Sequence, residues 1–475
     1  MLTALILLPL LLAALAPLLP WYRLRSWLLP LAGAVHLLLT LLLCLEAAPL
    51  TANAWLGLDA LARLVLLVVS LLFFGCACYA VEYLELRRDR GNRELVPCML
   101  VFLAAVSLAV AARHLGVLWF AVETTTIASA PSIYYNRNRL SIEATWKYLL
   151  LCSVGIALAM VGLLFIAYGA LAGGLPVSLH LDQLLGGAAQ LSPPWLQAGF
   201  VFLLVGFGAK MGLAPLHCWK PDAYGEAPGM IGALLAGGLT SVAFLAILRG
   251  VQLMTAAGDG AFARQLLLAL GLLSLLVAAV FMVRQRDLKR LLAYSSVEHM
   301  GILAIGVGIG GLATFGALLH LVNNALAKGC LFLSVGNIQR AFASKQISEV
   351  RGAVARVPIS GGLFLAGFLA ITGTPPFGLF LSEFTILRGM FQAGQGAVAA
   401  GVLLLLALVF IGMGTTVLGV AQGATPEGEI PYRDRLLLVA PPLVFLSLVL
   451  LLGLCLPEPL RRLLDEAVAL LEVGA

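Results

Sequence analysis

The chain has 475 residues, of which 61% are hydrophobic and only 11% are charged, and its mean hydropathy is +1.04. Soluble proteins carry about 25% charged residues, so this composition excludes an ordinary soluble protein and predicts one that is embedded in a membrane. The formal net charge of +6 does not indicate nucleic-acid binding, because the basic residues are scattered over short loops with no basic patch interleaved with aromatic residues.

Windows of about 20 apolar residues are long enough to cross the ~30 Å core of a bilayer. About fourteen such windows predict an all-α, polytopic membrane fold. The first window has no basic flank and no small-residue cleavage site, so we expect a membrane span there and not a cleaved signal peptide. In chain order, the predicted spans lie near 2–20, 27–48, 58–81, 95–112, 115–135, 146–169, 195–216, 229–248, 262–283, 291–310, 312–337, 359–386, 396–420 and 436–456.

The loops between these spans differ in charge. Most Lys and Arg residues lie in odd-numbered loops, counting from the loop that joins the first two spans. The even-numbered loops carry only Arg113, Arg249, Arg264 and Arg388. Because basic loops tend to stay in the cytoplasm, this asymmetry predicts that both termini lie on the outer side of the membrane.

The tail after Pro457 contains charged residues among leucines: Arg461, Arg462, Asp465 and Glu466. This mixture is typical of a short amphipathic helix at the membrane surface. A frayed chain end is the alternative interpretation.

Two predicted spans are interrupted by Gly and Pro, at 206–217 (GFGAKMGLAPLH) and 371–384 (ITGTPPFGLFLSEF). Paired interruptions in corresponding positions of two halves indicate a transport site, because irregular backbone at membrane depth needs protein or water around it. Each interruption falls in the fourth span of a five-span unit, and the odd number of spans predicts that the two units are inverted repeats. The predicted organisation is three spans in 1–94, the repeats in 95–250 and 251–425, and a last span with the tail in 426–475.

Five ionisable residues are predicted at membrane depth: Glu123, Lys210, His320, Lys328 and Glu383. A charge at the centre of a bilayer costs about 2.5–3.5 kcal/mol, so each needs a partner, water or a role. A Glu and a Lys on neighbouring helices hold each other charged, and we expect Glu123 and Lys210 to form such a pair. Separating the two would release the proton of Lys210. We therefore expect these five residues to form a proton path. The alternative is that some of them are neutral or are paired only for structure.

Other polar residues are weaker candidates. Asn324 lies four residues from both His320 and Lys328, so the three form one polar stripe along a helix. His299 opens a predicted span, where a solvated role is the alternative. Glu226 shares a loop with Lys220, and we interpret this loop either as solvated charge or as a site of proton uptake.

Three further residues are predicted to serve structure. His36 stands alone on an apolar helix, which is typical of a hydrogen-bonded structural histidine. Asp59 and Arg63 are spaced i, i+4 at a helix start, which predicts an ordinary ion pair.

Eight cysteines are spread along the chain. The only close pair, Cys76 and Cys78, lies about 200° apart around a helix, so these two thiols cannot clamp one metal ion. No spacing suits an iron–sulfur cluster, a c-type haem or structural zinc. We therefore expect no cofactor, metal or redox centre in this chain.

Several segments carry a family resemblance. The stretches VLWFAVETTTIASAP, FGAKMGLAPLHCWKPDAYGEAP, RDLKRLLAYSSVEHMGILAIG and GTPPFGLFLSEF resemble the antiporter-like, proton-translocating subunits of respiratory complex I, Mrp-type antiporters and membrane-bound hydrogenases. LSIEATWKYLLLCSVGIALAM looks most like component F of the hydrogenase-4 and formate hydrogenlyase group. The resemblance extends over roughly 55–420 and preserves the order of the motifs.

The resemblance implies fourteen core helices, two inverted repeats and both termini outside. By motif, Glu123 matches the family's fifth-helix glutamate, Lys210 its seventh-helix lysine, and Glu383 its twelfth-helix terminal residue. His320 and Lys328 match the eleventh-helix path.

The sequence departs from the family pattern at two places. Thr240 and Ser241 stand where many members have an eighth-helix Lys or His, and Asn324 stands where some have a second eleventh-helix His. A hydroxyl or an amide can orient water but holds no charge at neutral pH.

The function implied is that of a proton-pumping subunit of a membrane oxidoreductase complex, with no redox centre of its own. The resemblance places it in a prokaryotic inner membrane, where the outer side that carries both termini is the periplasm. Its expected partners are lipid, other membrane subunits, and hydrogenase and iron–sulfur subunits of a peripheral arm, with no nucleic acid. One alternative is a subunit of a Na⁺/H⁺ antiporter assembly. Another is a scaffold subunit that conducts nothing.

Overall fold

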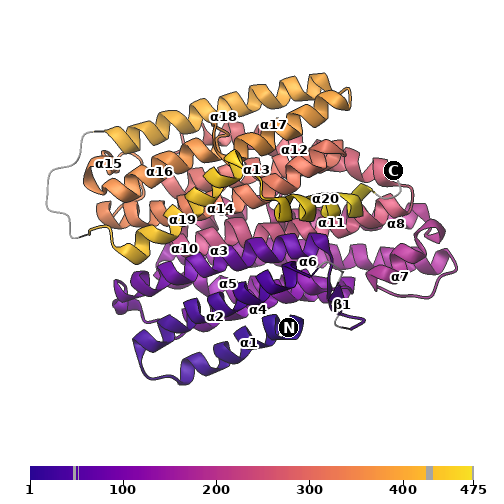
Figure 1. Ribbon diagram of the computed structural model, residues 1–475, viewed down its shortest axis with the longest axis horizontal. Coiled ribbons are helices and arrows are strands. Elements are labelled where there is room, and N and C mark those ends of the chain that lie inside the picture. Colours follow the sequence, from indigo (N-terminus) through magenta and orange to yellow (C-terminus); the bar gives the residue numbers. More distant parts are fainter. Residues whose placement is uncertain (47–49, 52, 424–431, 473–475) are drawn as a thin grey trace.

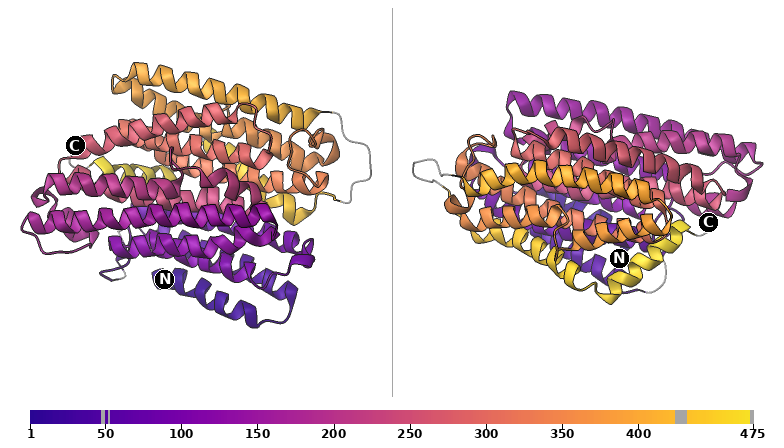
Figure 2. Two further views of the ribbon diagram at one scale, coloured as in Figure 1. Left: turned by 180° about the vertical axis from the view of Figure 1, so that it is seen from behind. Right: turned by 90° about the horizontal axis from the view of Figure 1, so that it is seen from above.

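The computed structural model describes residues 1–46, 50–51, 53–423 and 432–472. Its long helices run side by side along the long axis of the molecule, as Figure 1 shows from one side and Figure 2 from behind and from above. Strands β1 (Leu50–Thr51) and β2 (Gly57–Leu58) form a small antiparallel hairpin.

Each predicted span coincides with a helix or with a broken pair of helices, which confirms the all-α polytopic fold. The predicted end of the second span, at 48, lies outside the described residues. The spanning helices are α1 (Leu2–Leu15), α2 (Tyr22–Cys44), α3 (Ala60–Glu85), α4 (Leu95–Ala111), α5 (Leu115–Ile133), α6 (Arg139–Ala172), α8 (Pro193–Met211), α10 (Gly229–Ala233) with the π-helix η5 (Leu234–Leu239) and α11 (Thr240–Ala256), α12 (Gly260–Met282), α13 (Leu288–Ile309), α14 (Leu312–Phe342), α16 (Pro358–Ile371) with α17 (Gly378–Gln392), α18 (Gly396–Gln422) and α19 (Leu436–Leu454).

Short helices connect or follow these spans. They are η1 (Ala16–Leu18), η2 (Arg88–Arg90), η3 (Tyr134–Asn136), α7 (Leu181–Gly186), η4 (Ala188–Gln190), α9 (Trp219–Glu226), α15 (Ala353–Arg356) and α20 (Glu458–Glu472). The last of them confirms a helix in the tail. Helix α20 buries Leu464, Ala467 and Leu471 against the bundle. Its charged residues are exposed except for Glu472, which is half-buried and forms an ion pair with Arg264.

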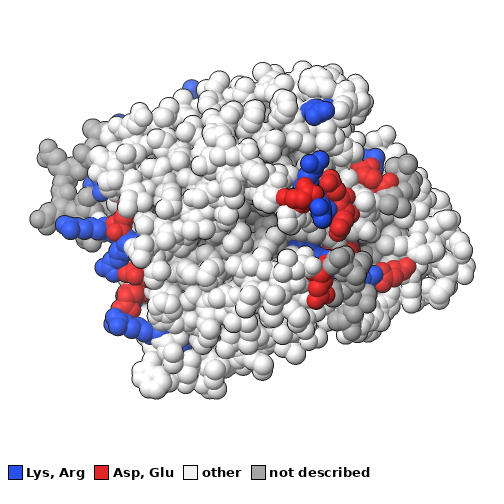
Figure 3. All heavy atoms as spheres, viewed as in Figure 1, with Lys and Arg blue, Asp and Glu red and all other residues white. Residues whose placement is uncertain are grey.

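The surface of the molecule fits a membrane. Among the described residues, ten helices are long and apolar enough to cross one, and three shorter apolar helices accompany them. On the face drawn in Figure 3, charged residues gather mainly toward the two ends of the long axis and leave an uncharged surface between them. Charged side chains are costly in lipid, so this uncharged surface is the part that can contact hydrocarbon.

The centre of the bundle is formed by α14 and by the run from α10 to α11, whose most apolar stretches are completely buried. Helix α8 approaches α6 so closely that a Cβ atom at Gly206 would lie 2.5 Å from the carbonyl oxygen of Gly155. Only glycine permits this approach, and it brings the last turn of α8, with Lys210, against α6.

Both predicted helix breaks are confirmed. Helix α8 ends at Met211 and α9 starts at Trp219, while α16 ends at Ile371 and α17 starts at Gly378. Gly212 and Gly373, at φ +83° and +65°, adopt the left-handed backbone that glycine tolerates best. The prolines within each break cannot donate a helical hydrogen bond. The domain boundaries stay predictions, and the one between 425 and 426 lies outside the described residues.

The structure corrects one predicted ion pair. Asp59 caps α3 by accepting a hydrogen bond from the Ala62 amide, and its carboxylate pairs with Arg249 of α11 instead of with Arg63. Arg63 donates to the carbonyl oxygen of Glu46. The i, i+4 spacing was misleading because the carboxylate stays at the start of α3 as its cap, where Arg249 of a neighbouring helix reaches it.

The structural role predicted for His36 is confirmed. Its Nε2 is hydrogen-bonded to Ser107 Oγ on α4 at 2.7 Å, and its Nδ1 to Ser70 Oγ on α3 at 2.9 Å. Both ring nitrogens are therefore satisfied, and the imidazole ties α2 to two neighbouring helices.

The Asp59–Arg249 pair predicts a pH-dependent contribution to stability. Burial raises the pKa of Asp59, but the charge and hydrogen bonds of Arg249 and the Ala62 amide outweigh it and hold this pKa below its usual value. Because the folded-state pKa is depressed, the stabilisation is present above the unfolded-state pKa of about 3.9 and is lost as the pH falls through the folded-state value. We expect Asp59→Asn to destabilise the fold at neutral pH by about 3 kcal/mol.

Thermal unfolding of the detergent-solubilised chain across a pH series measures this effect. The matched control is Glu94→Gln, which breaks the exposed ion pair with Arg137 and is expected to change stability by less than about 1 kcal/mol. An Asp59→Asn deficit that persists unchanged below the pH at which Asp59 protonates would contradict the prediction.

Candidate functional site

Lys210 lies in the last turn of α8 and is completely buried. Its Nζ donates hydrogen bonds to Thr126 Oγ1 on α5 at 2.5 Å and to the Tyr148 hydroxyl on α6 at 3.1 Å. The ammonium also lies 5.0 Å from the centre of the Tyr148 ring. A cation at the C-terminal end of a helix is favoured by the helix dipole, so the break in α8 provides a stabilising position for this charge.

Glu123 reaches Lys210 only through a bridge. Thr126 Oγ1 donates to Glu123 Oε2 at 2.9 Å, and Ser153 Oγ donates to Glu123 Oε1 at 2.7 Å. The sequence predicted that Glu123 and Lys210 would form a pair, but among the described residues no direct ion pair joins them. The hydroxyl of Thr126 instead accepts from the ammonium and donates to the carboxylate, which makes a three-member hydrogen-bonded chain.

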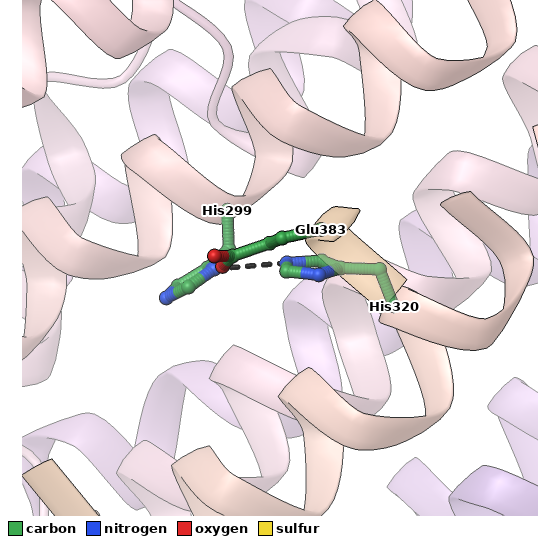
Figure 4. A group of neighbouring side chains, drawn as sticks. All are labelled: His299, His320 and Glu383. Carbon is green, nitrogen blue, oxygen red and sulfur yellow. Dashed lines mark hydrogen bonds between the residues drawn. The ribbon is translucent and has the colours of Figure 1, made fainter. Parts of the chain in front are cut away.

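A second group of polar residues lies at the other break. His299 of α13, His320 of α14 and Glu383 of α17 point toward one another (Figure 4), with donor atoms that all lie within 4.8 Å. His299 Nδ1 and His320 Nε2 are 2.9 Å apart and hydrogen-bonded, and His320 Nδ1 is bonded to Ser382 Oγ at 2.9 Å. The solvated alternative for His299 is wrong, because this side chain is completely buried.

The break between α16 and α17 accommodates the carboxylate of Glu383. A Cβ atom at Gly373 would lie 2.2 Å from Glu383 Oε2, so the side chain occupies the space that the glycine leaves. Three groups of this kind could ligate a cation. However, one nitrogen of each histidine is already engaged in the bond between the two rings, which is the arrangement that passes a proton.

Lys328 and Asn324 continue the polar stripe of α14. Both are buried, and Lys328 Nζ donates to the carbonyl oxygen of Leu292 on α13 at 3.2 Å. The buried carboxylate of Glu298 lies close enough for its charge to interact with Lys328. Among the described residues, His299 Nε2 and Asn324 Oδ1 have no hydrogen-bond partner, and buried groups of this type generally bind ordered water.

The remaining candidates lie apart from these groups. Glu226 forms an ion pair with Lys345 at 2.7 Å, and Lys345 also pairs with Asp287 at 3.1 Å. Ser241 Oγ donates to the carbonyl oxygen of Gly237 at 2.5 Å, and Thr240 Oγ1 to that of Ala236 at 2.6 Å. The two hydroxyls therefore direct their protons into their own helix.

The burial of Lys220 within the helix bundle was not predicted from the sequence. This lysine was grouped with solvated loop charges, but its side chain is completely buried and its Nζ donates to Ser296 Oγ on α13 at 3.1 Å. Residues 219–226 fold back into the bundle as α9. The flanking Trp219 was the available signal, because a large aromatic side chain is more often buried than solvated.

Comparisons with known proteins agree on one family. Residues 112–412 match the family model described as NADH:quinone oxidoreductase/Mrp antiporter, TM. The chain is 36% identical to a hydrogenase-4 component F homologue of Methylacidiphilum infernorum, over 78% of this chain and 79% of the relative. It is 32% identical to NADH-quinone oxidoreductase subunit N of Desulforudis audaxviator, over 82% of this chain and 78% of the relative.

The fold also matches a chain in the solved structure of a membrane-bound sulfane sulfur reductase, described as an archaeal respiratory membrane complex. The TM-score is 0.89 at 22% identity, and the match covers 99% of this chain and 97% of that one. The family match, the relatives and the fold agree with the resemblance found in the sequence motifs. The chain belongs to the NADH:quinone oxidoreductase/Mrp antiporter transmembrane family.

Proposed function

We propose that this chain conducts protons across a prokaryotic inner membrane as one subunit of a redox-driven complex. The observation that carries the proposal is a pair of hydrogen-bonded polar groups within the helix bundle, each beside a break in a membrane helix. One joins Glu123, Thr126 and Lys210, and the other joins His299, His320 and Ser382 beside Glu383. Ionisable residues at such positions are typical of proton relays.

The two histidines supply a defined transfer step. An imidazole can accept a proton on one nitrogen and release one from the other. A proton that arrives at the open Nε2 of His299 therefore frees the proton on Nδ1, which moves to His320 Nε2 across 2.9 Å. His320 then releases its other proton from Nδ1 toward Ser382 and the neighbouring Glu383 carboxylate.

Lys210 supplies the switch at the first group. Its ammonium is stabilised by the Thr126 and Tyr148 hydroxyls and, through Thr126, by the carboxylate of Glu123. Protonation of Glu123, or its movement away from Thr126, weakens this stabilisation and favours release of the Lys210 proton. The odd-numbered loops, by their basic residues, are proposed to face the cytoplasm, and both termini the periplasm.

The partners proposed are other membrane subunits together with hydrogenase and iron–sulfur subunits in a peripheral arm. The name of the component F homologue supports the hydrogenase class of complex. No cysteine spacing in the sequence suits a redox centre, so the energy for pumping would come from these partners. A Na⁺/H⁺ antiporter assembly is the second candidate, favoured by the family description, which includes Mrp antiporters.

The purified complex in sealed vesicles separates these functions. With its electron donor, we expect proton uptake that is unchanged when sodium is replaced by choline, and no uptake of radioactive sodium. Sodium uptake that follows turnover would favour the antiporter class. Turnover without proton movement would favour the non-conducting scaffold.

The bridge through Thr126 makes a prediction of its own. Thr126→Val keeps nearly the same volume but removes the hydroxyl that joins Glu123 to Lys210, and Glu123→Gln removes the charge. We expect each variant to slow proton uptake several-fold. The double variant should be no slower than the slower of the two single variants, because both changes interrupt the same hydrogen-bonded connection between Glu123 and Lys210. Thr124→Val on the same helix, whose hydroxyl bonds only its own helix carbonyl at Phe120, is the control. Additive losses in the double variant would argue against the bridge.

A further inference from the structure

Lys220 occupies a position between the two groups of the site. It lies in the first turn of α9, and its aliphatic stem packs over Gly212, where a Cβ atom would come 2.2 Å from Lys220 Cε. Its Nζ bonds Ser296 on α13. Ser296 is three residues before His299 on α13, so both side chains lie on one face of that helix.

Charged and titratable groups from several helices surround Lys220. Its charge interacts with Lys328 of α14 and with the thiol of Cys152 on α6, and Lys210 interacts with the same thiol. Within its own segment it influences His217 and lies 5.9 Å from the centre of the Tyr224 ring, and on α13 it influences His299. Lys220 therefore neighbours Lys328 and His299 on one side, and on the other side it shares the Cys152 thiol with Lys210.

The alternative is a purely structural role, in which the Lys220 side chain only packs against its neighbours. Among the described residues, however, no carboxylate forms an ion pair with its ammonium, although the side chain is completely buried. Burial of a charge without a counter-charge is unfavourable, and a methionine would fill the same space without that penalty. The presence of a lysine here is explained if its function requires a side chain that gains and loses a proton.

The run from α10 to α11 offers no substitute for such a group. Thr240 and Ser241 cannot hold a charge at neutral pH, and their hydroxyl protons are directed to their own helix. We propose that Lys220 is the titrating station that passes protons between Lys210 and the group of Lys328 and His299. This inference rests on the proposed proton conduction and adds to it the residue that joins its two halves.

The test uses the whole complex in sealed vesicles with its electron donor, and compares Lys220→Met with Lys210→Ala and wild type. We expect Lys220→Met to assemble and to lose at least tenfold in proton uptake per electron. Lys147→Met, which changes a half-exposed lysine on α6, is expected to leave uptake unchanged.

Two further variants separate a relay from a structural role. Lys220→His keeps a titrating group of lower pKa, so we expect partial uptake whose high-pH limb moves to lower pH. Ser296→Ala removes the hydrogen-bond partner and is expected to slow uptake without abolishing it. These two variants also decide the question if Lys220→Met does not assemble, since wild-type rates and pH profiles in both would overturn the proposal.

The outcomes distinguish this inference from the proposed function. If Lys220→Met pumps like wild type while Lys210→Ala fails, the station is refuted and proton conduction stands. If the wild-type complex moves no protons, the proposed function fails, and the relay fails with it. If Lys220→Met fails, Lys147→Met is normal and Lys220→His shifts the pH profile, the station is supported.

Discussion

Lys210→Ala is expected to abolish proton translocation by the assembled complex, with a loss of about 100-fold or more, the scale of removing an acid–base group. The substitution leaves the Thr126 and Tyr148 hydroxyls without the donor that they now share. Unpaired buried polar groups cost about 1–3 kcal/mol, which is too little to prevent assembly. The measurement is proton uptake by vesicles, normalised to the amount of assembled complex.

Lys210→Arg tests whether the site needs the positive charge of the lysine or the proton that the lysine can release. Guanidinium stays protonated under all conditions in a protein, so the Arg variant keeps the positive charge but cannot release a proton. We expect it to assemble and to pump no better than the Ala variant. Uptake at the wild-type rate with Arg at this position would show that the charge, and not its proton, is what the site needs.

His320→Gln is expected to have an effect of similar size. Glutamine can keep hydrogen bonds to His299 and Ser382, but its amide cannot accept a proton on one side and release one on the other. The step between α13 and α17 is therefore interrupted while the packing is largely retained. We expect proton uptake to fall by about 100-fold with little change in assembly.

His36→Gln is the matched control for His320→Gln. Both histidines are buried and both bond serine hydroxyls, but His36 contacts no other titrating group in its hydrogen bonds. Its replacement is expected to lower the thermal stability of the chain and to leave uptake per assembled complex unchanged. Equal losses of uptake in the two variants would mean that His320, like His36, serves structure.

Local chemistry made much of this fold predictable. The apolar runs fixed the number and order of the spans, and the glycines and prolines of 206–217 and 371–384 marked both breaks. Lys210 and Glu383 were found because a charge inside an apolar run is conspicuous. The structure places both of these residues beside the breaks.

Tertiary contacts were not predictable from the same signals. Asp59 pairs with Arg249, 190 residues away, and no periodicity links the two positions. Lys220 looked like a loop residue because other polar residues surround it on the chain, and only the folding of α9 into the bundle buries it. The bridge through Thr126 depends on how α5 faces α8, which helical spacing alone does not determine.

In the proposed relay, the bond between His299 and His320 limits how closely one proton can follow another. After one proton has passed, each ring carries its remaining proton on the opposite nitrogen, and the pair has no free acceptor facing the incoming side. The next proton in the same direction must wait until both rings have returned to their first tautomer. The pair would therefore admit one proton per reset, and a passive leak through it would be no faster than that reset.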